Sequence, residues 1–411
     1  MPICLGWDAM NNRMHHAPRP RARTARRRAA VLAAIGGLAV LAAGCGGGGG
    51  LPVAAPSHSP GLPSSSAGAG RPHQHHGHGH QGRPPVSGGS MNPAQESAGT
   101  GNKSGVSGGA LFGGTNALAQ EDAKLGRKLA IVREYYHIGE KFPTPESKKL
   151  MASGSTLLVS LDSVGSNGPS YSAIAAGRED ATIRAFLKAM NEAARSYHLG
   201  SIYISFEHEA DNPQHVPLGS PAEFVKAWDH IHQLAVSAHL NWNDGGRLHW
   251  VLILMHAAYY RDMPAWQTGG PASAYWPGAS EVDVLAADGY NHIGCKQSSQ
   301  GGSAGSAVSL SPGDLFNPLI SFAHSHGGLA VFITEWGTQA GKYASRQPAF
   351  IGQMRAYVTG NREIAAAMYF DSRNPNYPAC SSIINDLPAS VSAMAAMGHS
   401  SGLQGRVVAS S

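Results

Sequence analysis

Residues 201–209 have the sequence SIYISFEHE and show a pattern that recurs along the central part of the chain. Ser201 to Phe206 form a short, largely apolar run with β-branched and aromatic residues, which predicts a buried strand. The run ends in the polar residues Glu207, His208 and Glu209. A strand that served only for packing would not need these residues, so we expect its carboxyl end to carry functional side chains.

Seven further stretches have the same β-rich apolar character: 110–116, 131–138, 156–163, 249–260, 282–291, 329–337 and 365–372. Longer amphipathic stretches separate them, and residues 180–197 and 221–238 have apolar side chains at helical spacing. This alternation predicts repeated βα units and a parallel sheet. Eight such units over roughly 260 residues match an α/β fold of the (β/α)8 TIM-barrel type. A doubly wound open sheet is the alternative, but no phosphate-binding glycine-rich loop follows the first strand.

Polar or aromatic residues end most of the expected strands. In a (β/α)8 barrel the carboxyl ends of the strands form one rim, where the chemistry takes place. The barrel would therefore bring Glu209 and Glu335 across one cleft. Two facing carboxyl groups suit glycoside hydrolysis, because a protonated one donates to the leaving oxygen while the other attacks or activates water. The other strand-end residues are Asp162, Glu207, His208, His256, Tyr259, Tyr260, Asp288, Tyr290, Asn291, Trp336 and Asp371.

Three segments carry more specific information: FEHEADN at 206–212, DGYN at 288–291 and ITEWG at 333–337. With them the chain resembles the large clan of retaining (β/α)8 glycosidases, and within it family 26, the β-mannanase group. The resemblance extends from Ala110 to Asp371. It implies a β-linked polysaccharide substrate, either mannan or a related hemicellulose or β-glucan.

The resemblance also implies roles for individual residues. Glu209 would be the general acid and then the base, and Glu335 the nucleophile that forms a glycosyl-enzyme. Tyr290 would hydrogen-bond Glu335 and hold its orientation, and His208 would reach the sugar or the nucleophile. We expect no metal and no cofactor at this site.

Further candidate substrate-binding residues belong to the same rim. Flat aromatic side chains suit stacking on the C–H faces of sugar rings, and ordinary packing is the alternative for each of them. The candidates are Asn212, His256, Tyr260, Trp266 and Trp336.

Glu207 has several possible roles, because alternate residues of a strand point to the same side. It could share the cleft with Glu209 and raise the pKa of one of the two carboxyls. It could also be the acid itself, or pair with a residue of the third or fifth strand. We favour Glu209 as the acid.

The chain departs from family 26 next to this glutamate. Residues 205–207 are Ser-Phe-Glu where mannanases usually have Arg-Pro-Phe, and Asp211 stands where the family has an asparagine, with Asn212 one place later. These departures keep an alternative function open, that of a carbohydrate-binding surface lipoprotein without turnover.

The amino-terminal end has the features of an export signal. Seven arginines between Arg13 and Arg28 precede the apolar run 29–43, which is shorter than the roughly 20 residues of a membrane-spanning helix. The run leads into LAAGC at 41–45, which resembles a bacterial lipobox. This resemblance implies a lipid anchor at Cys45 and an extracytoplasmic protein, held at the cell membrane or secreted.

We therefore expect three parts, a signal peptide at 1–44, a tether at 45–109 and the barrel domain at 110–400. The tether is rich in Gly, Ser, Pro, Ala and His, so it buries too little apolar surface to offset its conformational entropy and should be disordered. Its tract HQHHGHGH at 73–80 could bind metal ions weakly or serve only as a polar linker.

Charge and cysteine usage complete the expectations. The seven arginines and Asp8 give the signal peptide a charge of +6, whereas the whole chain carries +5, so the mature protein is near −1 and its basic pI does not indicate nucleic-acid binding. In an exported protein Cys295 and Cys380 are expected to form a disulfide, with two free thiols as the alternative. We expect a monomer.

Overall fold

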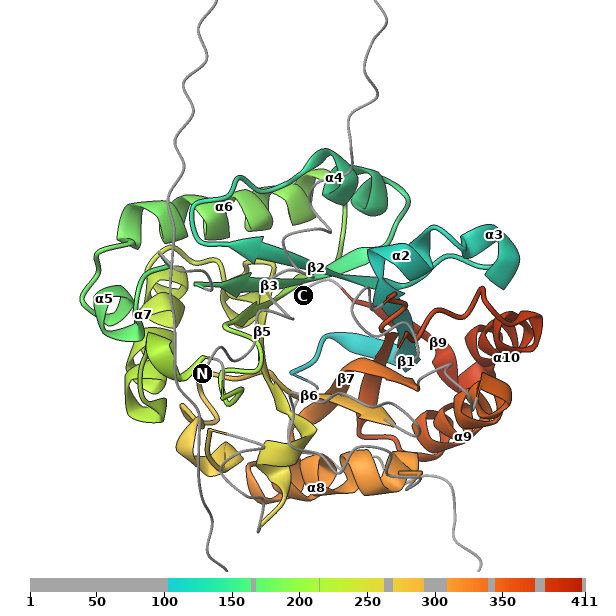
Figure 1. Cartoon of the computed structure of the whole chain (residues 1–411). Coiled ribbons are helices and arrows are strands. Elements are labelled where there is room, and N and C mark those ends of the chain that lie inside the picture. Colours follow the sequence, from blue (N-terminus) through green and yellow to red (C-terminus); the bar gives the residue numbers. More distant parts are fainter. Residues whose placement is uncertain are drawn as a thin grey trace, which may run out of the picture. The chain divides into compact units, whose positions relative to one another are not determined.

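The computed structural model describes residues 103–163, 168–213, 215–261, 269–291, 309–338, 344–373 and 381–408. Within these ranges eight parallel strands form a closed sheet, because β1 pairs with both β2 and β8 (Figure 1). This (β/α)8 barrel confirms the predicted fold class. The strands are β1 (Val106–Thr115), β2 (Ile131–His137), β3 (Thr156–Asp162), β4 (Ile202–Phe206), β5 (Leu248–Met255), β6 (Val284–Asn291), β7 (Ala330–Thr338) and β8 (Ile364–Tyr369).

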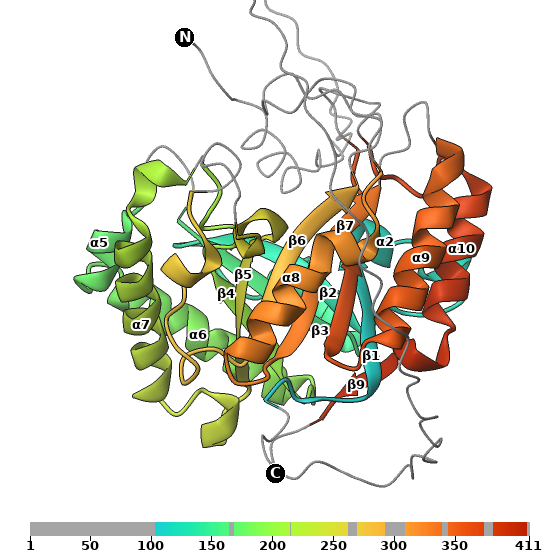
Figure 2. The ribbon, with the colours of Figure 1, turned by 90° about the horizontal axis from the view of Figure 1, so that it is seen from below.

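A further strand, β9 (Gln404–Val407), pairs antiparallel with the beginning of β1. Figure 2 shows β6 and β7 pointing toward the opposite end of the barrel from β9. The carboxyl ends of the parallel strands therefore face away from this added strand.

The helices surround the sheet (Figure 1). They are α2 (Asn116–Ala119), α3 (Asp122–Leu125), α4 (Pro145–Ala152), α5 (Tyr171–Ala175), α6 (Asp180–Ser196), α7 (Pro221–Val236), α8 (Pro312–Ser325), α9 (Gln347–Gly360) and α10 (Pro388–Gly398). Short 3-10 turns lie at Val216–Leu218, Trp242–Asp244, His256–Tyr259, Ala272–Ala274, Ala344–Arg346 and Ser401–Leu403. Within the described residues, no helix has the length and apolar character needed to cross a bilayer.

The strands have continuous apolar sequences because one apolar cluster fills the barrel and another lies between the strands and the surrounding helices. In β5, Val251 and Ile253 belong to a cluster inside the barrel, whereas Trp250, Leu252 and Leu254 belong to the larger cluster that includes the residues of the surrounding helices. Because both faces of each strand are covered, both sets of alternating residues are apolar. The interior of the barrel is thus a packed core that supports the rim above it.

The predicted elements overlap the observed ones, but several strand ends differ. Strand β1 begins at Val106, four residues before the predicted stretch 110–116, and β8 ends at Tyr369, three residues before the predicted end at 372. Helices α6 and α7 end within two residues of the predicted positions. Strand β4 ends at Phe206, because the backbone of Glu207 and Glu209 is left-handed, with φ of 49° and 52°. Strand β5 ends at Met255 and continues as a 3-10 turn. The predicted stretches 201–209 and 249–260 were therefore too long.

Candidate active site

Glu335 lies near the end of β7, and its two carboxylate oxygens make one ion pair and two hydrogen bonds. Arg133 Nη1 is 2.9 Å from Oε1, the Tyr135 hydroxyl also donates to Oε1, and the Tyr290 hydroxyl donates to Oε2. The expected hydrogen bond from Tyr290 is therefore present. The Glu335 side chain is buried, with 2% of its surface exposed, so these three side chains fix its position.

A β-bulge in β7 shapes this part of the site. Asp288 of β6 is in register with Glu335, although its neighbour Ala287 is in register with Ile333, so Thr334 is an extra residue in β7. The Thr334 hydroxyl donates to Asp288 Oδ1 at 2.5 Å. The bulge thus lets two consecutive residues of one strand reach the same group of polar side chains.

Arg133 joins the two carboxylates of β6 and β7. Its Nη1 lies 2.9 and 3.0 Å from the two carboxylate oxygens of Asp288, and its Nε donates to Ser160 at 3.1 Å. The arginine side chain is completely buried. Burial raises the pKa of Asp288 to about 7, against the opposing effect of Arg133. The positive charge of one guanidinium group therefore offsets the cost of burying two carboxyl groups, those of Asp288 and Glu335.

Sequence reasoning missed Arg133 and Tyr135. Both lie inside the stretch IVREYYHI, which was interpreted only as a strand. The available signal was a charged residue within a strand expected to be buried, because such a charge requires a partner.

Glu209 lies in the turn that follows β4. Burial raises the pKa of this carboxyl well above its usual range, and the charges of Asp288, Glu335 and Asp211 raise it further. The side-chain amide of Asn212 donates to Oε2 at 3.1 Å and opposes the shift. The charge of Glu335 is among those that act on Glu209, so the two carboxyls lie within electrostatic range of each other. The environment of Glu209 therefore favours the protonated form of its carboxyl.

Glu207 belongs to a different cluster. Its Oε2 accepts from the backbone N–H of Ser163 at 2.9 Å and from the hydroxyl of the same residue at 2.6 Å. Burial, followed by the charge of Asp162, raises the pKa of Glu207 to about 8. Strand alternation does not place Glu207 beside Glu209, because both residues are left-handed and lie beyond the strand. Pairing with the end of the third strand was the correct alternative.

His208 lies next to this cluster and does not contact Glu335 within the described residues. Its Nδ1 is 3.7 Å from Asp162 Oδ2, and its ring meets that of Tyr135 edge to face at 5.3 Å. Burial, and then the charge of Arg133, lower the pKa of His208 well below its usual range. The imidazole is therefore neutral. In the part of the chain that the structure describes, no group of His, Cys, Asp and Glu side chains is arranged to hold a metal ion.

Two more candidates occupy the rim on the side of β5. His256 Nδ1 lies 3.3 Å from the carbonyl oxygen of Asp288, and burial lowers the pKa of this histidine to about 4. The rings of His256 and Tyr260 lie 6.0 Å apart, and the Tyr260 hydroxyl donates to the carbonyl of Asp314. Both side chains are partly exposed, so they are accessible to a ligand.

Trp336 does not belong to the rim, which corrects the sequence-based expectation. Its side chain is completely buried in the outer apolar layer. It packs against Tyr369 with 4.8 Å between ring centroids and against Phe350 of α9 with 6.3 Å. A ring enclosed in this way cannot stack on a sugar.

The remaining predicted positions lie outside the described residues. They are the lipidation site Cys45, the cysteines Cys295 and Cys380, Trp266 and the histidine tract at 73–80.

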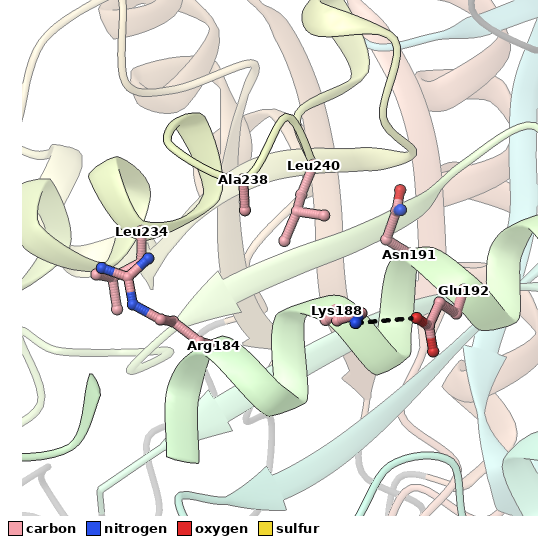
Figure 3. Close-up of a pocket in the computed structure, with 7 residues that line it drawn as sticks. All are labelled: Arg184, Lys188, Asn191, Glu192, Leu234, Ala238 and Leu240. Carbon is pink, nitrogen blue, oxygen red and sulfur yellow. Dashed lines mark ion pairs between the residues drawn. The ribbon is translucent and has the colours of Figure 1, made fainter. Parts of the chain in front are cut away.

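Two cavities lie away from the carboxylates. One of about 420 Å³ lies beside α6 and the end of α7, where Leu234 and Leu240 line it and an ion pair of 3.8 Å joins Lys188 to Glu192 (Figure 3). The other, of about 690 Å³, includes Lys103 and the beginning of β1. Neither contains a residue of the candidate site.

No protein-family model matches the chain, and no curated protein matches it in sequence. Several solved structures are similar. A GH128 (subgroup I) endo-β-1,3-glucanase from Amycolatopsis mediterranei in complex with laminaripentaose is 13% identical, with a TM-score of 0.42 over 71% of this chain and 100% of that one. A GH128 (subgroup II) endo-β-1,3-glucanase from Sorangium cellulosum is 15% identical, with a TM-score of 0.41 over 70% and 97%. An endo-β-1,4-glucanase from Xanthomonas axonopodis pv. citri is 11% identical, with a TM-score of 0.47 over 70% and 98%. At these levels of similarity, the function has to be argued from the geometry of the site itself.

Proposed function

We propose that the chain is a glycoside hydrolase that cleaves β-linked polysaccharides by a retaining double displacement. The observation that carries the proposal is the contrast between two carboxyl groups of one site. Glu209 is buried, and its environment favours the protonated form. Glu335 forms an ion pair with Arg133 and accepts hydrogen bonds from two tyrosine hydroxyls, which suits an ionised carboxylate.

This contrast matches the two tasks of the reaction. Glu209 would donate its proton to the glycosidic oxygen as the bond to the anomeric carbon breaks, while Glu335 attacks that carbon to form a glycosyl-enzyme. Glu209, now ionised, would then remove a proton from the water that releases the sugar from Glu335. The second step restores the proton of Glu209 and frees the carboxylate of Glu335, so the site is regenerated without a cofactor.

The surrounding residues would support this division of work. Arg133 and the two tyrosines would hold the nucleophile in one orientation, which lowers the entropic barrier to attack. His256 and Tyr260, both partly exposed, would contact the sugar chain from the side of β5. The neutral His208 would support the rim by packing its ring edge to face against Tyr135.

We also propose that the enzyme acts outside the cytoplasm as a lipid-anchored protein. The lipobox-like sequence at 41–45 and the low-complexity segment that follows it support this location. Polysaccharides such as β-mannan and related hemicelluloses or β-glucans would then be encountered at the cell surface. The motifs shared with the β-mannanase group favour mannan among them.

The test is a panel of β-mannan, β-xylan, mixed-linkage glucan and β-1,3-glucan with a reducing-sugar readout. The proposal expects at least one polysaccharide to be hydrolysed by the wild-type protein and not by Glu335→Ala. If nothing is hydrolysed but an oligosaccharide binds, the chain is a carbohydrate-binding lipoprotein and the enzymatic proposal fails.

A further inference from the structure

Glu209 sits in a backbone turn of unusual conformation. Glu207 and Glu209 both have positive φ, 49° and 52°. Side chains with a Cβ disfavour this left-handed region, so such residues persist only where the surrounding structure holds them. The turn from Glu207 to Ala210 must therefore be held by contacts with its neighbours.

Two buried acidic side chains, Glu207 at the start of the turn and Asp211 just after it, each accept hydrogen bonds from a neighbouring part of the sheet. On one side, Glu207 Oε2 accepts two hydrogen bonds from Ser163, which follows β3. On the other side, Asp211 Oδ1 accepts from the backbone N–H of Met255, the last residue of β5, at 2.9 Å. Glu207 is 1% exposed and Asp211 is completely buried. Because β4 lies between β3 and β5 in the sheet, the side chains of Glu207 and Asp211 hold the turn on both sides.

The backbone of the turn follows the same scheme. The N–H of Glu207 donates to the carbonyl of Leu161 in β3, and the N–H of Glu209 donates to the carbonyl of Ile253 in β5, both at 2.9 Å. The backbone and side-chain hydrogen bonds of the turn therefore continue the contacts of β4 with β3 and with β5 beyond Phe206, where the strand ends. Asn212, next after Asp211, then reaches back to the Glu209 carboxyl.

We propose that Glu207 and Asp211 are positioning residues that direct the Glu209 carboxyl at the glycosidic oxygen. This inference rests on the proposed function of Glu209. Neither Glu207 nor Asp211 transfers a proton in the proposed reaction, since each side chain accepts hydrogen bonds from the end of a neighbouring strand. Their effect reaches the reaction through the position of Glu209, so it belongs to the step in which the leaving oxygen is protonated.

The test compares substrates that differ in their need for that proton. The single variants Glu207→Ala and Asp211→Ala are assayed on a series of aryl β-glycosides, from a poor to a good leaving group, with folding checked by circular dichroism. A displacement of about 1 Å in a catalytic group costs about 10²-fold in rate. We expect this loss with the poorest leaving group and less than about threefold loss in forming the glycosyl-enzyme with the best one.

A matched control separates positioning from general damage. Asp283 accepts from the backbone N–H of Trp250 at 2.8 Å, so it makes the same kind of bond to β5 near the opposite end of that strand. Asp283→Ala should change the rates of all substrates by the same factor. Glu207→Gln keeps an oxygen that accepts from Ser163, and it should restore most of the activity lost in Glu207→Ala.

If an alanine variant does not fold, Ser163→Ala decides, because it removes one of the two donors to Glu207 and should show a weaker form of the same leaving-group dependence. An equal loss across the series in the folded variants, or Glu207→Gln as impaired as Glu207→Ala, overturns the inference while leaving the proposed function intact. Failure of the proposed function looks different, since the wild-type protein would then hydrolyse none of the substrates.

Discussion

Arg133 is a completely buried cation that lies within 3.0 Å of two carboxyl groups, those of Asp288 and Glu335. Transferring three ionisable groups from water to the protein interior is unfavourable unless charges and hydrogen bonds compensate each other. Here the two contacts to Asp288 and one to Glu335 provide the compensation. Removal of the arginine alone would leave the carboxyl groups of Asp288 and Glu335 buried without this compensating charge.

We therefore predict that Arg133→Leu lowers the free energy of unfolding by about 3–5 kcal/mol, the usual result of breaking a buried ion pair. Arg184→Leu is the control, because Arg184 pairs with Asp180 at 3.7 Å on the surface and should contribute about 1 kcal/mol or less. Urea denaturation of both variants measures the difference. Equal losses in the two variants would mean that the buried pair contributes no more than the exposed one.

At the residue scale, part of the site could be predicted from the sequence. Glu335 and Tyr290 stand at strand ends in segments with recognisable motifs, and the structure brings them into contact. Arg133 was missed because β2 and β7 are far apart in the sequence, and their side chains meet at one site only when the barrel closes. Trp336 was assigned to the wrong face, although strand alternation alone places it opposite its neighbour Glu335.

At the element scale, hydrophobic periodicity predicted the strands and helices well but not where β4 ends. A left-handed backbone at Glu207 and Glu209 leaves no trace in an apolar pattern, since it depends on tertiary hydrogen bonds to β3 and β5. The helices were easier to predict, because the spacing of buried residues in α6 and the Ser220 cap of α7 are local properties of the sequence.

The ends of β2 and β3 are joined by a titratable pair. His137 and Asp162 are in register, and His137 Nδ1 lies 2.5 Å from Asp162 Oδ1. The hydrogen bond and charge of Asp162, with smaller effects of Glu140 and Glu207, raise the pKa of His137 to about 9. Because this pKa is higher in the folded state than its usual value of 6.5, the pair stabilises the protein in the protonated form.

The pair should therefore contribute fully below about pH 6.5 and lose its contribution as the pH rises through about 9. We predict that His137→Gln is less stable than the wild type at pH 6 and nearly equal to it at pH 10, when both are unfolded with urea. A stability difference that stays constant or grows with pH would show that His137 does not act through its charge.

At the scale of the whole molecule, the sequence predicted a closed barrel because eight strand-like stretches alternated with amphipathic ones. The added strand β9 was not predicted, since four residues, Gln404–Val407, give too short a pattern to distinguish from a loop. Its pairing with β1 is a long-range contact that only the folded chain specifies.

The proposed export signal leads to a prediction for the whole protein. Since LAAGC at 41–45 resembles a lipobox, we expect the mature protein made in a bacterial host to partition into the detergent phase. The Cys45→Ser variant should stay in the aqueous phase, because it lacks the thiol that is acylated. Equal partitioning of the two proteins would argue against a lipid anchor at this cysteine.

Glu209 is assigned as the acid and base, and Glu335 as the nucleophile. An added anion that replaces a missing carboxylate tests these two roles directly. In Glu209→Ala, an activated aryl glycoside should still form the glycosyl-enzyme, because a good leaving group needs little protonation, but hydrolysis should be slow without the base. Azide can enter the vacated space and attack the intermediate without a base.

The decisive measurement is the anomeric configuration of the glycosyl azide that Glu209→Ala releases, determined by nuclear magnetic resonance. The proposed roles predict a product of retained configuration, because the anomeric carbon is inverted twice, first by attack of Glu335 and then by attack of azide. They also predict no turnover of any substrate by Glu335→Ala without added anion. An inverted azide product from Glu209→Ala, or a retained one from Glu335→Ala, would contradict the assignment of the nucleophile to Glu335.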